Sequence, residues 1–266
     1  MSYFKIAMLA SGSKGNSALI KAGEVYFLVD MGLSCRELTK RLEKVGVSPD
    51  ELKGVFITHE HIDHIKGLET FTKKFSVPLY SSENTWRVIV NRLKNIRRDN
   101  LYTISDEFSI GEVKITSFSI PHDATDPHGY YFTSPNGEKC TYLTDVGHIT
   151  KTLKKVVQGT TSLILETNHD VDMLKTGSYP YELKRRILST LGHLSNESAG
   201  NFLAELDVLP EQIILAHLSQ ENNRPELALE TVKNILAKSG KEGNFLVASQ
   251  GEIVGSILSA DQLSIF

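Results

Sequence analysis

The stretch Thr58-His59-Glu60-His61-Ile62-Asp63-His64 limits what this chain can fold into more than any other feature. It places three imidazoles and the Asp63 carboxylate within six residues, directly after an apolar run at 54–58 that predicts a strand. Residues two apart in extended backbone point the same way, so His59 and His61 can share one metal ion. A turn then redirects Asp63 and His64 toward a second ion. Imidazole with carboxylate suits Zn, Mn or Fe, and the absence of thiolate argues against a closed structural zinc site.

More ligand-type residues stand at the ends of predicted strands. His122 follows the strand expected at 113–120, Asp145 the strand at 139–144, and His217 the strand at 212–216. Sites on mixed sheets gather at such ends. Each residue alone has an ordinary alternative, as a core histidine, a helix N-cap or a loop histidine. Together with the first cluster they support a metal centre.

The pattern along the chain favours strands interleaved with helices in both halves. This predicts an α+β four-layer αββα sandwich, with two mixed sheets face to face and helices outside, whereas periodicity alone supports only α/β or α+β. A polar loop at 11–17 separates the first two predicted strands, and Pro135-Asn136-Gly137 predicts a hairpin turn. The other strands are expected at 4–9, 25–29, 54–58, 130–133, 162–165, 244–247 and 252–254, and helices at 34–45, 67–75, 83–93, 181–191, 196–206 and 226–237.

Composition limits the class of protein and the cellular compartment that we expect. The 266 residues carry a formal net charge of -3, which argues against a protein that coats nucleic acid non-specifically but leaves room for a nuclease. Cys35 and Cys140 form no disulfide framework, no signal peptide is evident, and no apolar run reaches the roughly 20 residues that span a bilayer. We expect a cytoplasmic protein with no membrane partner, and the oligomeric state is open.

These motifs resemble the metallo-β-lactamase superfamily. Its H-x-H-x-D-H motif matches His59, His61, Asp63 and His64, and its earlier aspartate, which orients the metal loop, matches Asp30. The resemblance implies the αββα fold, two divalent metal ions (Zn or Mn) and hydrolysis. It implies one metal held by His59, His61, His122 and Asp145, and a second held by Asp63, His64, His217 and the bridging Asp145.

A general acid is still needed to protonate the leaving group. His193 is the candidate, because it stands 24 residues before His217 and phosphodiesterases of the superfamily have a similar histidine at a comparable span. Glu166 is expected to orient His193, and we count Asp63, His193 and Glu166 as catalytic. A helix-capping neighbour is the alternative for His193. His128 and His148 receive no role, and His169 is either a polar residue beside the ligands or a loop histidine.

Four stretches resemble the WalJ/YycJ (VicX) family, a branch assigned 5′-to-3′ DNA exonuclease activity. They are residues 11–17, 166–170, 192–196 and 217–223. Larger relatives insert a β-CASP domain after the fourth motif, but only 72 positions separate Asp145 from His217 here. A second domain needs roughly 100 residues. We therefore expect one metallo-β-lactamase domain over 1–266, without that insertion.

The substrate must then be held by local loops. Lys184 and Arg186 are expected to contact phosphates, Asn16 and Ser195 to make polar contacts, and a tyrosine at 179 or 181 to stack on an end base. A solvated helix start is the alternative for the basic residues. DNA is the expected substrate. A small or cyclic phosphate ester, RNA, a thioester or lactam, and a binding module without chemistry are the alternatives.

Overall fold

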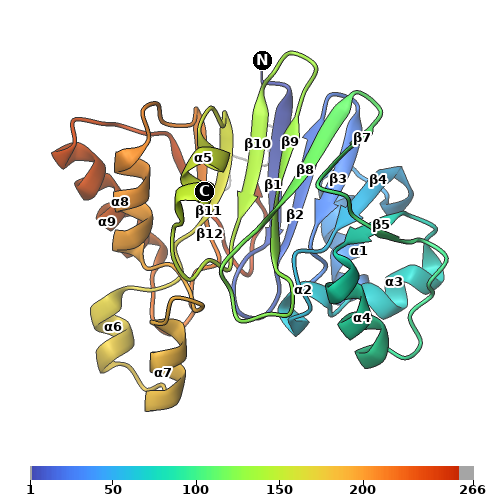
Figure 1. Ribbon diagram of the computed structural model, residues 1–266, viewed down its shortest axis with the longest axis horizontal. Coiled ribbons are helices and arrows are strands. Elements are labelled where there is room, and N and C mark those ends of the chain that lie inside the picture. The colour runs from blue at the N-terminus through green and yellow to red at the C-terminus, as the bar shows by residue number, and fades with distance from the viewer. Residues whose placement is uncertain (1, 258–266) are drawn as a thin grey trace.

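Two sheets stacked face to face form the centre of the molecule in the computed structural model, which describes residues 2–257 (Figure 1). Within these residues each sheet has seven strands, in the orders β14-β1-β2-β3-β4-β5-β6 and β13-β12-β11-β10-β9-β8-β7. The first half of the chain builds the first sheet. The second half builds the second sheet and then returns one strand, β14, to the edge of the first.

The first sheet comprises β1 (Phe4–Ala10), β2 (Ser17–Ala22), β3 (Val25–Val29), β4 (Leu52–Phe56), β5 (Leu79–Ser81), β6 (Leu101–Thr103) and β14 (Val254–Gly255). The second comprises β7 (Glu107–Ile110), β8 (Val113–Ser119), β9 (His128–Thr133), β10 (Lys139–Leu143), β11 (Ser162–Glu166), β12 (Gln212–Ala216) and β13 (Phe245–Val247). The strands β10 to β13 run parallel, and helices and the other sheet cover them, so β11 and β12 read as nearly unbroken apolar runs.

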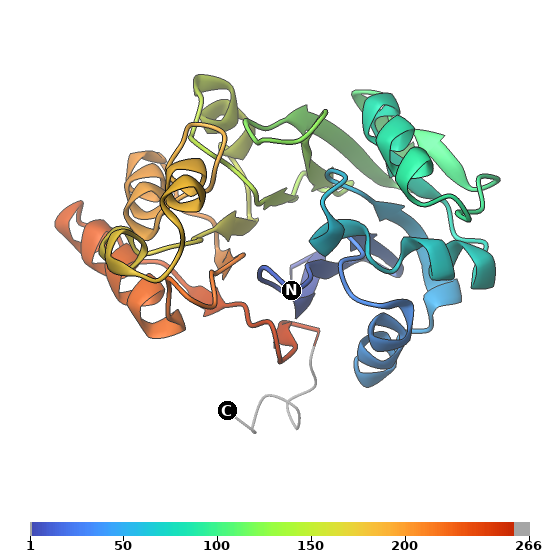
Figure 2. The same cartoon turned by 90° about the horizontal axis from the view of Figure 1, so that it is seen from below.

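Helices cover the outer face of each sheet, on opposite flanks in Figure 2. The first flank holds α1 (Cys35–Lys44), the 3-10 turn η1 (Pro49–Glu51), α2 (Ile62–Ile65), α3 (Leu68–Lys74) and α4 (Glu83–Arg92). The second holds α5 (Lys151–Val157), α6 (Val171–Thr176), α7 (Tyr181–Ile187), α8 (Asn196–Glu205) and α9 (Pro225–Lys238).

Three apolar layers hold this arrangement together. The middle layer lies between the sheets and is rich in aromatic rings, with Phe27 stacked on Phe132 at 5.4 Å between ring centroids. The outer layers pack α1, α3 and α4 on the first sheet, and α5, α8 and α9 on the second. The αββα sandwich expected from the sequence is therefore confirmed.

Local signals in the sequence explain several elements. Ser34 caps α1 by accepting a hydrogen bond from the Glu37 N–H, and α1 buries Leu38 and Leu42 on one face. Gly137 takes a positive φ of 85° in the turn between β9 and β10, as the hairpin prediction requires.

Other elements differ from the expectation. The helix expected over 181–191 ends at Ile187, because the chain turns so that the His193 N–H can donate to the Ile187 carbonyl. The sequence pattern did not predict β2, which is buried on both faces and so lacks the alternation of a half-buried strand. It also missed α2, where a helical turn replaces the expected simple turn at Asp63, and α5, α6, β5 and β6. Within residues 2–257, no helix is long and apolar enough to span a membrane.

Candidate metal centre

The predicted metal ligands meet where strands of both sheets end. His59 follows β4, His122 follows β8, Asp145 comes two residues after the end of β10, and His217 directly follows β12. Asp63 and His64 come from α2, at the lower end of the sandwich in Figure 1. The fold therefore brings donors from both halves of the chain to one place.

Backbone conformation marks three residues of this site. Asp30, Asp145 and His217 have positive φ angles of 62°, 60° and 57°, and within residues 2–257 every other residue with φ in this region is a glycine. This conformation is unfavourable for residues with a Cβ, although Asp and His adopt it more readily than most. Such strain clusters at functional sites, so these turns support a role for all three residues.

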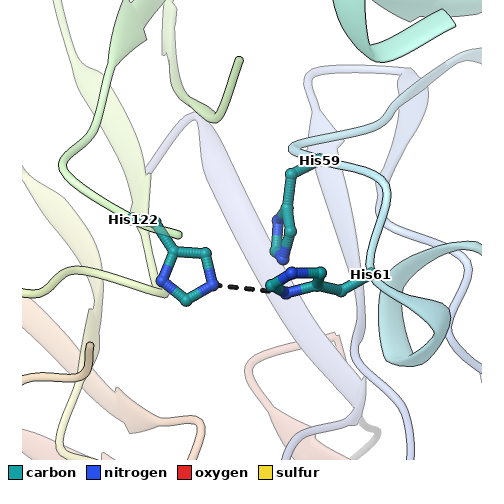
Figure 3. A group of neighbouring side chains, drawn as sticks. All are labelled: His59, His61 and His122. Carbon is teal, nitrogen blue, oxygen red and sulfur yellow. Dashed lines mark hydrogen bonds between the residues drawn. The ribbon is translucent and has the colours of Figure 1, made fainter. Parts of the chain in front are cut away.

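One group of donors consists of three imidazoles (Figure 3). His59, His61 and His122 each offer a ring nitrogen, and these nitrogens lie within 4.8 Å of one another. His122 Nε2 lies 3.3 Å from His61 Nδ1, while its Nδ1 lies 3.2 Å from the Gly192 carbonyl oxygen. Donation from Nδ1 to that carbonyl leaves Nε2 as the ligand atom.

The second group adds carboxylates. Asp63, His64 and His217 place one ligand atom each within 4.8 Å of one another, and so do His59, His64 and Asp145. Asp145 stands between the two groups: its oxygens lie 3.4 Å from His64 Nε2 and 3.8 Å from His122 Nε2. This position suits a carboxylate that bridges two ions.

Asp30 lies behind the motif and is fully buried. Its carboxylate accepts the Thr58 backbone N–H at 2.9 Å and lies 2.7 Å from His64 Nδ1. It therefore holds the start of the loop that carries the predicted ligands and leaves His64 Nε2 free of this contact. Thr58, which the sequence analysis did not single out, also places its hydroxyl 2.9 Å from His59 Nδ1.

Glu166 orients two histidines at once. Its Oε1 lies 2.8 Å from His193 Nδ1 and 2.7 Å from His217 Nδ1. Its Oε2 accepts the backbone N–H groups of Val146 at 2.8 Å and Leu194 at 3.0 Å. The link to His193 was expected, but the link to His217 was missed, because nothing in the sequence indicates that one carboxylate serves both rings.

Unpartnered buried atoms test whether this site fits metal ions. His59 Nε2, His217 Nε2 and Asp145 Oδ2 are buried and have no hydrogen-bond partner among residues 2–257. A buried polar atom without a partner is costly, and divalent cations would satisfy all three. The residues therefore fit the divalent metal binding that the fold implies.

Charge and burial act on the titrating groups of the site. Burial, together with the charges of His64 and His122, holds the pKa of His59 well below its usual value, which keeps the ring neutral and able to bind a cation. Burial opposes ionisation of Asp63, but the neighbouring His64 and His217 outweigh it and lower the pKa of that carboxyl. Both groups are thus in the form that ligates a metal.

A cavity of about 260 Å³ opens beside the centre. His61, Asp63, Asp145, His193 and His217 line one side of it. The remaining lining residues are Ser13 of the 11–17 loop, Asn168 and Ser219 after β11 and β12, and Tyr179, Leu183, Arg186 and Ile187 of the α6–α7 segment.

The predicted substrate contacts take different places. Arg186 lines the cavity and pairs with Asp123, whereas Lys184 donates to the carbonyls of Lys175 and Gly177 and is not among the lining residues. Asn16 is buried, and its amide lies 3.2 Å from both Asp63 Oδ2 and His64 Nε2. Ser195 caps α8 by accepting the Ser198 N–H.

The candidate donor groups do not include His128, His148 or His169. His128 and His148 place Nδ1 near backbone carbonyls, of Asp126 and Thr190. His169 is buried, neither ring nitrogen has a hydrogen-bond partner among residues 2–257, and burial lowers its pKa to about 4. Ser11 was missed as well: its hydroxyl accepts the His217 N–H at 2.6 Å, so the 11–17 loop supports the last predicted ligand.

Comparison with known proteins agrees with this geometry. Residues 26–218 match the family described as the beta-lactamase superfamily domain. The chain is 38% identical to exodeoxyribonuclease YycJ of Bacillus anthracis, over 88% of this chain and 89% of that protein. It is 37% identical to exodeoxyribonuclease WalJ of Streptococcus pneumoniae, over 89% of each.

Among solved structures, the metallo-β-lactamase fold protein YhfI from Bacillus subtilis superposes with a TM-score of 0.71 at 17% identity. The superposition covers 95% of this chain and 99% of that one. This likeness concerns the fold alone, whereas the sequence matches cover most of the chain at a level that shows kinship. The chain belongs to the metallo-β-lactamase superfamily, in the branch that contains these two relatives.

Proposed function

We propose that this protein is a metal-dependent exodeoxyribonuclease that hydrolyses the phosphodiester bonds of DNA. The observation that carries the proposal is the contact of one carboxylate oxygen of Glu166 with both His193 and His217. It places an oriented histidine outside the predicted ligand set directly beside that set. The names of the two relatives, both exodeoxyribonucleases, support DNA as the substrate.

We propose two divalent ions, Zn or Mn, in this centre. His59, His61, His122 and Asp145 would hold the first, and Asp63, His64, His217 and Asp145 the second. When bound, such ions lower the pKa of water and stabilise the charge that develops on phosphate oxygens.

The side chains of this chain supply the remaining chemistry. His193 lines the cavity, and its Nδ1 is held by Glu166, so Nε2 is the atom that can protonate the leaving oxygen. Glu166 is fully buried and acts through the two rings, as a positioning residue. Asp63, also on the cavity wall, keeps a carboxylate beside the reacting phosphate.

Residues that line the cavity would make the contacts with the substrate. Arg186 carries the positive charge among the lining residues and can pair with a phosphate, and Tyr179 offers a ring for stacking on a base. Asn16 is buried and donates to Asp63 Oδ2, so it acts by orienting that carboxylate. Ser195 and Lys184 contribute by holding α8 and the α6–α7 connection in place.

We further propose one domain without an inserted β-CASP domain, and cleavage from the 5′ end. The first point is supported by the elements between Asp145 and His217, which are the strands β11 and β12 of the second sheet and the helices α5, α6, α7 and α8 at its flank. The second rests on the resemblance to the WalJ/YycJ family.

A phosphodiesterase acting on a small or cyclic ester is the second candidate. The volume of the cavity favours this candidate. About 260 Å³ lies near the lower end of the range for small-ligand pockets, whereas a DNA duplex is far too large to be enclosed in it. DNA would have to enter by one end, or lie across the mouth.

The test is a nuclease assay on protein stripped of metal and reloaded with Mn²⁺ or Zn²⁺. End-labelled duplex DNA, single-stranded DNA and RNA are compared, with bis-p-nitrophenyl phosphate as the small ester and the His61→Ala protein as the control. Stepwise shortening of DNA from a 5′ end, lost in the control, supports the exonuclease. Cleavage of the small ester with DNA left intact overturns it in favour of the second candidate, and preference for RNA overturns the choice of DNA.

A further inference from the structure

Glu60 lies between two predicted metal ligands in the sequence, and its carboxylate contacts a residue that is not a predicted ligand. Its Oε1 accepts the Thr125 backbone N–H at 2.8 Å and the Thr125 hydroxyl at 2.6 Å. The side chain is 9% exposed, and its Oε2 is buried with no hydrogen-bond partner among residues 2–257. A buried carboxylate that meets only neutral donors is costly, so its presence needs a reason.

This contact joins the two halves of the fold. Glu60 belongs to the loop after β4 of the first sheet, and Thr125 to the 121–127 loop after β8 of the second. The two residues are 65 positions apart. His61 comes directly after Glu60, and His122 is carried by the same loop as Thr125, so the contact ties together two backbones that each supply an imidazole.

Neighbouring contacts fix the 121–127 loop on both sides. The His128 N–H donates to the Thr58 carbonyl at 3.0 Å, and the Asp123 N–H to the Leu191 carbonyl at 3.0 Å. Arg92 donates to the Glu60 carbonyl at 3.3 Å. The Glu60 carboxylate therefore links the H-x-H loop to the loop carrying His122 through Thr125, beside the contact of the His61 and His122 rings themselves.

We propose that Glu60 is a positioning residue for the metal centre: it sets the approach of His61 and His122, which come from different sheets, to the distance that one ion requires. The proposal rests on the proposed metal centre but not on the choice of substrate. Glu60 touches neither metal nor substrate. Glu60 acts through its contact with Thr125. Loss of the Glu60 carboxylate therefore leaves the positions of the His61 and His122 rings less well fixed, without removing a ligand.

The test measures metal affinity instead of turnover. Zn²⁺ affinity is determined by chelator competition, and the absorption spectrum of the Co²⁺-loaded protein reports the ligand geometry. Glu60→Ala is expected to weaken binding about 10- to 100-fold, the usual size for residues that support metal ligands, and to shift the Co²⁺ bands. Glu60→Gln keeps an oxygen that accepts both Thr125 donors and is expected to restore most of the affinity.

Two further variants separate positioning from general damage. Thr125→Val removes only the hydroxyl donor of an exposed residue, so the fold is kept and a smaller loss of affinity is expected. Glu83→Ala is the control, since its carboxylate pairs with Arg87 on the surface of α4. Wild-type Zn²⁺ affinity and Co²⁺ spectrum in both Glu60→Ala and Thr125→Val would overturn the proposal. A wild-type protein that binds metal normally but leaves DNA intact would instead refute the proposed function alone.

Discussion

The carboxylate of Glu166 lies 2.8 Å from Nδ1 of His193, and this contact fixes which ring nitrogen faces the cavity. The Nε2 atom of His193 is therefore left free to protonate the leaving group of the substrate. His193→Ala should keep its metals and lose about 10²- to 10⁴-fold in kcat on DNA. Metal content and kcat are measured on the same preparation.

The leaving group provides a control for that prediction. The p-nitrophenolate released from bis-p-nitrophenyl phosphate needs little protonation, so His193→Ala should slow hydrolysis of this ester much less than that of DNA. An equal loss on both substrates would contradict a role as general acid.

Asp145 is predicted to bridge the ions, and its φ of 60° dictates the substitution. Asp145→Asn keeps a residue that tolerates this conformation and removes the negative charge. We expect bound metal to fall and activity to be abolished, as measured by metal analysis and the nuclease assay. Unchanged metal stoichiometry in Asp145→Asn would refute the bridging assignment.

Arg186 is predicted to hold a phosphate at the cavity wall. Arg186→Gln should raise the KM for DNA and reduce the slope of log K against log salt by about one. Arg185→Gln is the matched control, because Arg185 lies next in the same helix and pairs with Glu182 on the surface. Identical behaviour of the two variants would remove Arg186 from the substrate site.

His169 gives a prediction on pH and stability. Burial lowers its folded pKa to about 4, so below its ordinary value of 6.5 the unfolded chain takes up a proton that the folded chain does not. Stability is therefore lost as the pH falls from 6.5 toward 4, by about 3 kcal/mol at most. Urea unfolding of metal-free protein at pH 7.5 and pH 5 should show a smaller loss for His169→Gln than for the wild type.

The sequence predicted the fold and a set of candidate ligands that the structure brings together, because these depend on local signals. The H-x-H-x-D-H motif is contiguous, and His122, Asp145 and His217 each follow a strand that is visible in the pattern. The positions given for those strands were correct to within a few residues.

Contacts between distant segments could not be predicted in this way. The two bonds from Glu60 to Thr125 and the second bond of Glu166, to His217, depend on how the sheets stack. The end of α7 at Ile187 has the same origin, since the Leu191 and Gly192 carbonyls that follow it receive hydrogen bonds from the loop of His122. No local pattern records these contacts.

The donors of the metal centre come from both sheets, and this has a consequence outside catalysis. Any ion held there fastens the two halves of the chain to each other, so its binding energy adds to the energy of folding. When the metal supply is low, the contact between the two halves would separate more often, and the separated chain would be exposed to proteases. The amount of this protein in a cell should follow the metal supply even when its substrate is absent.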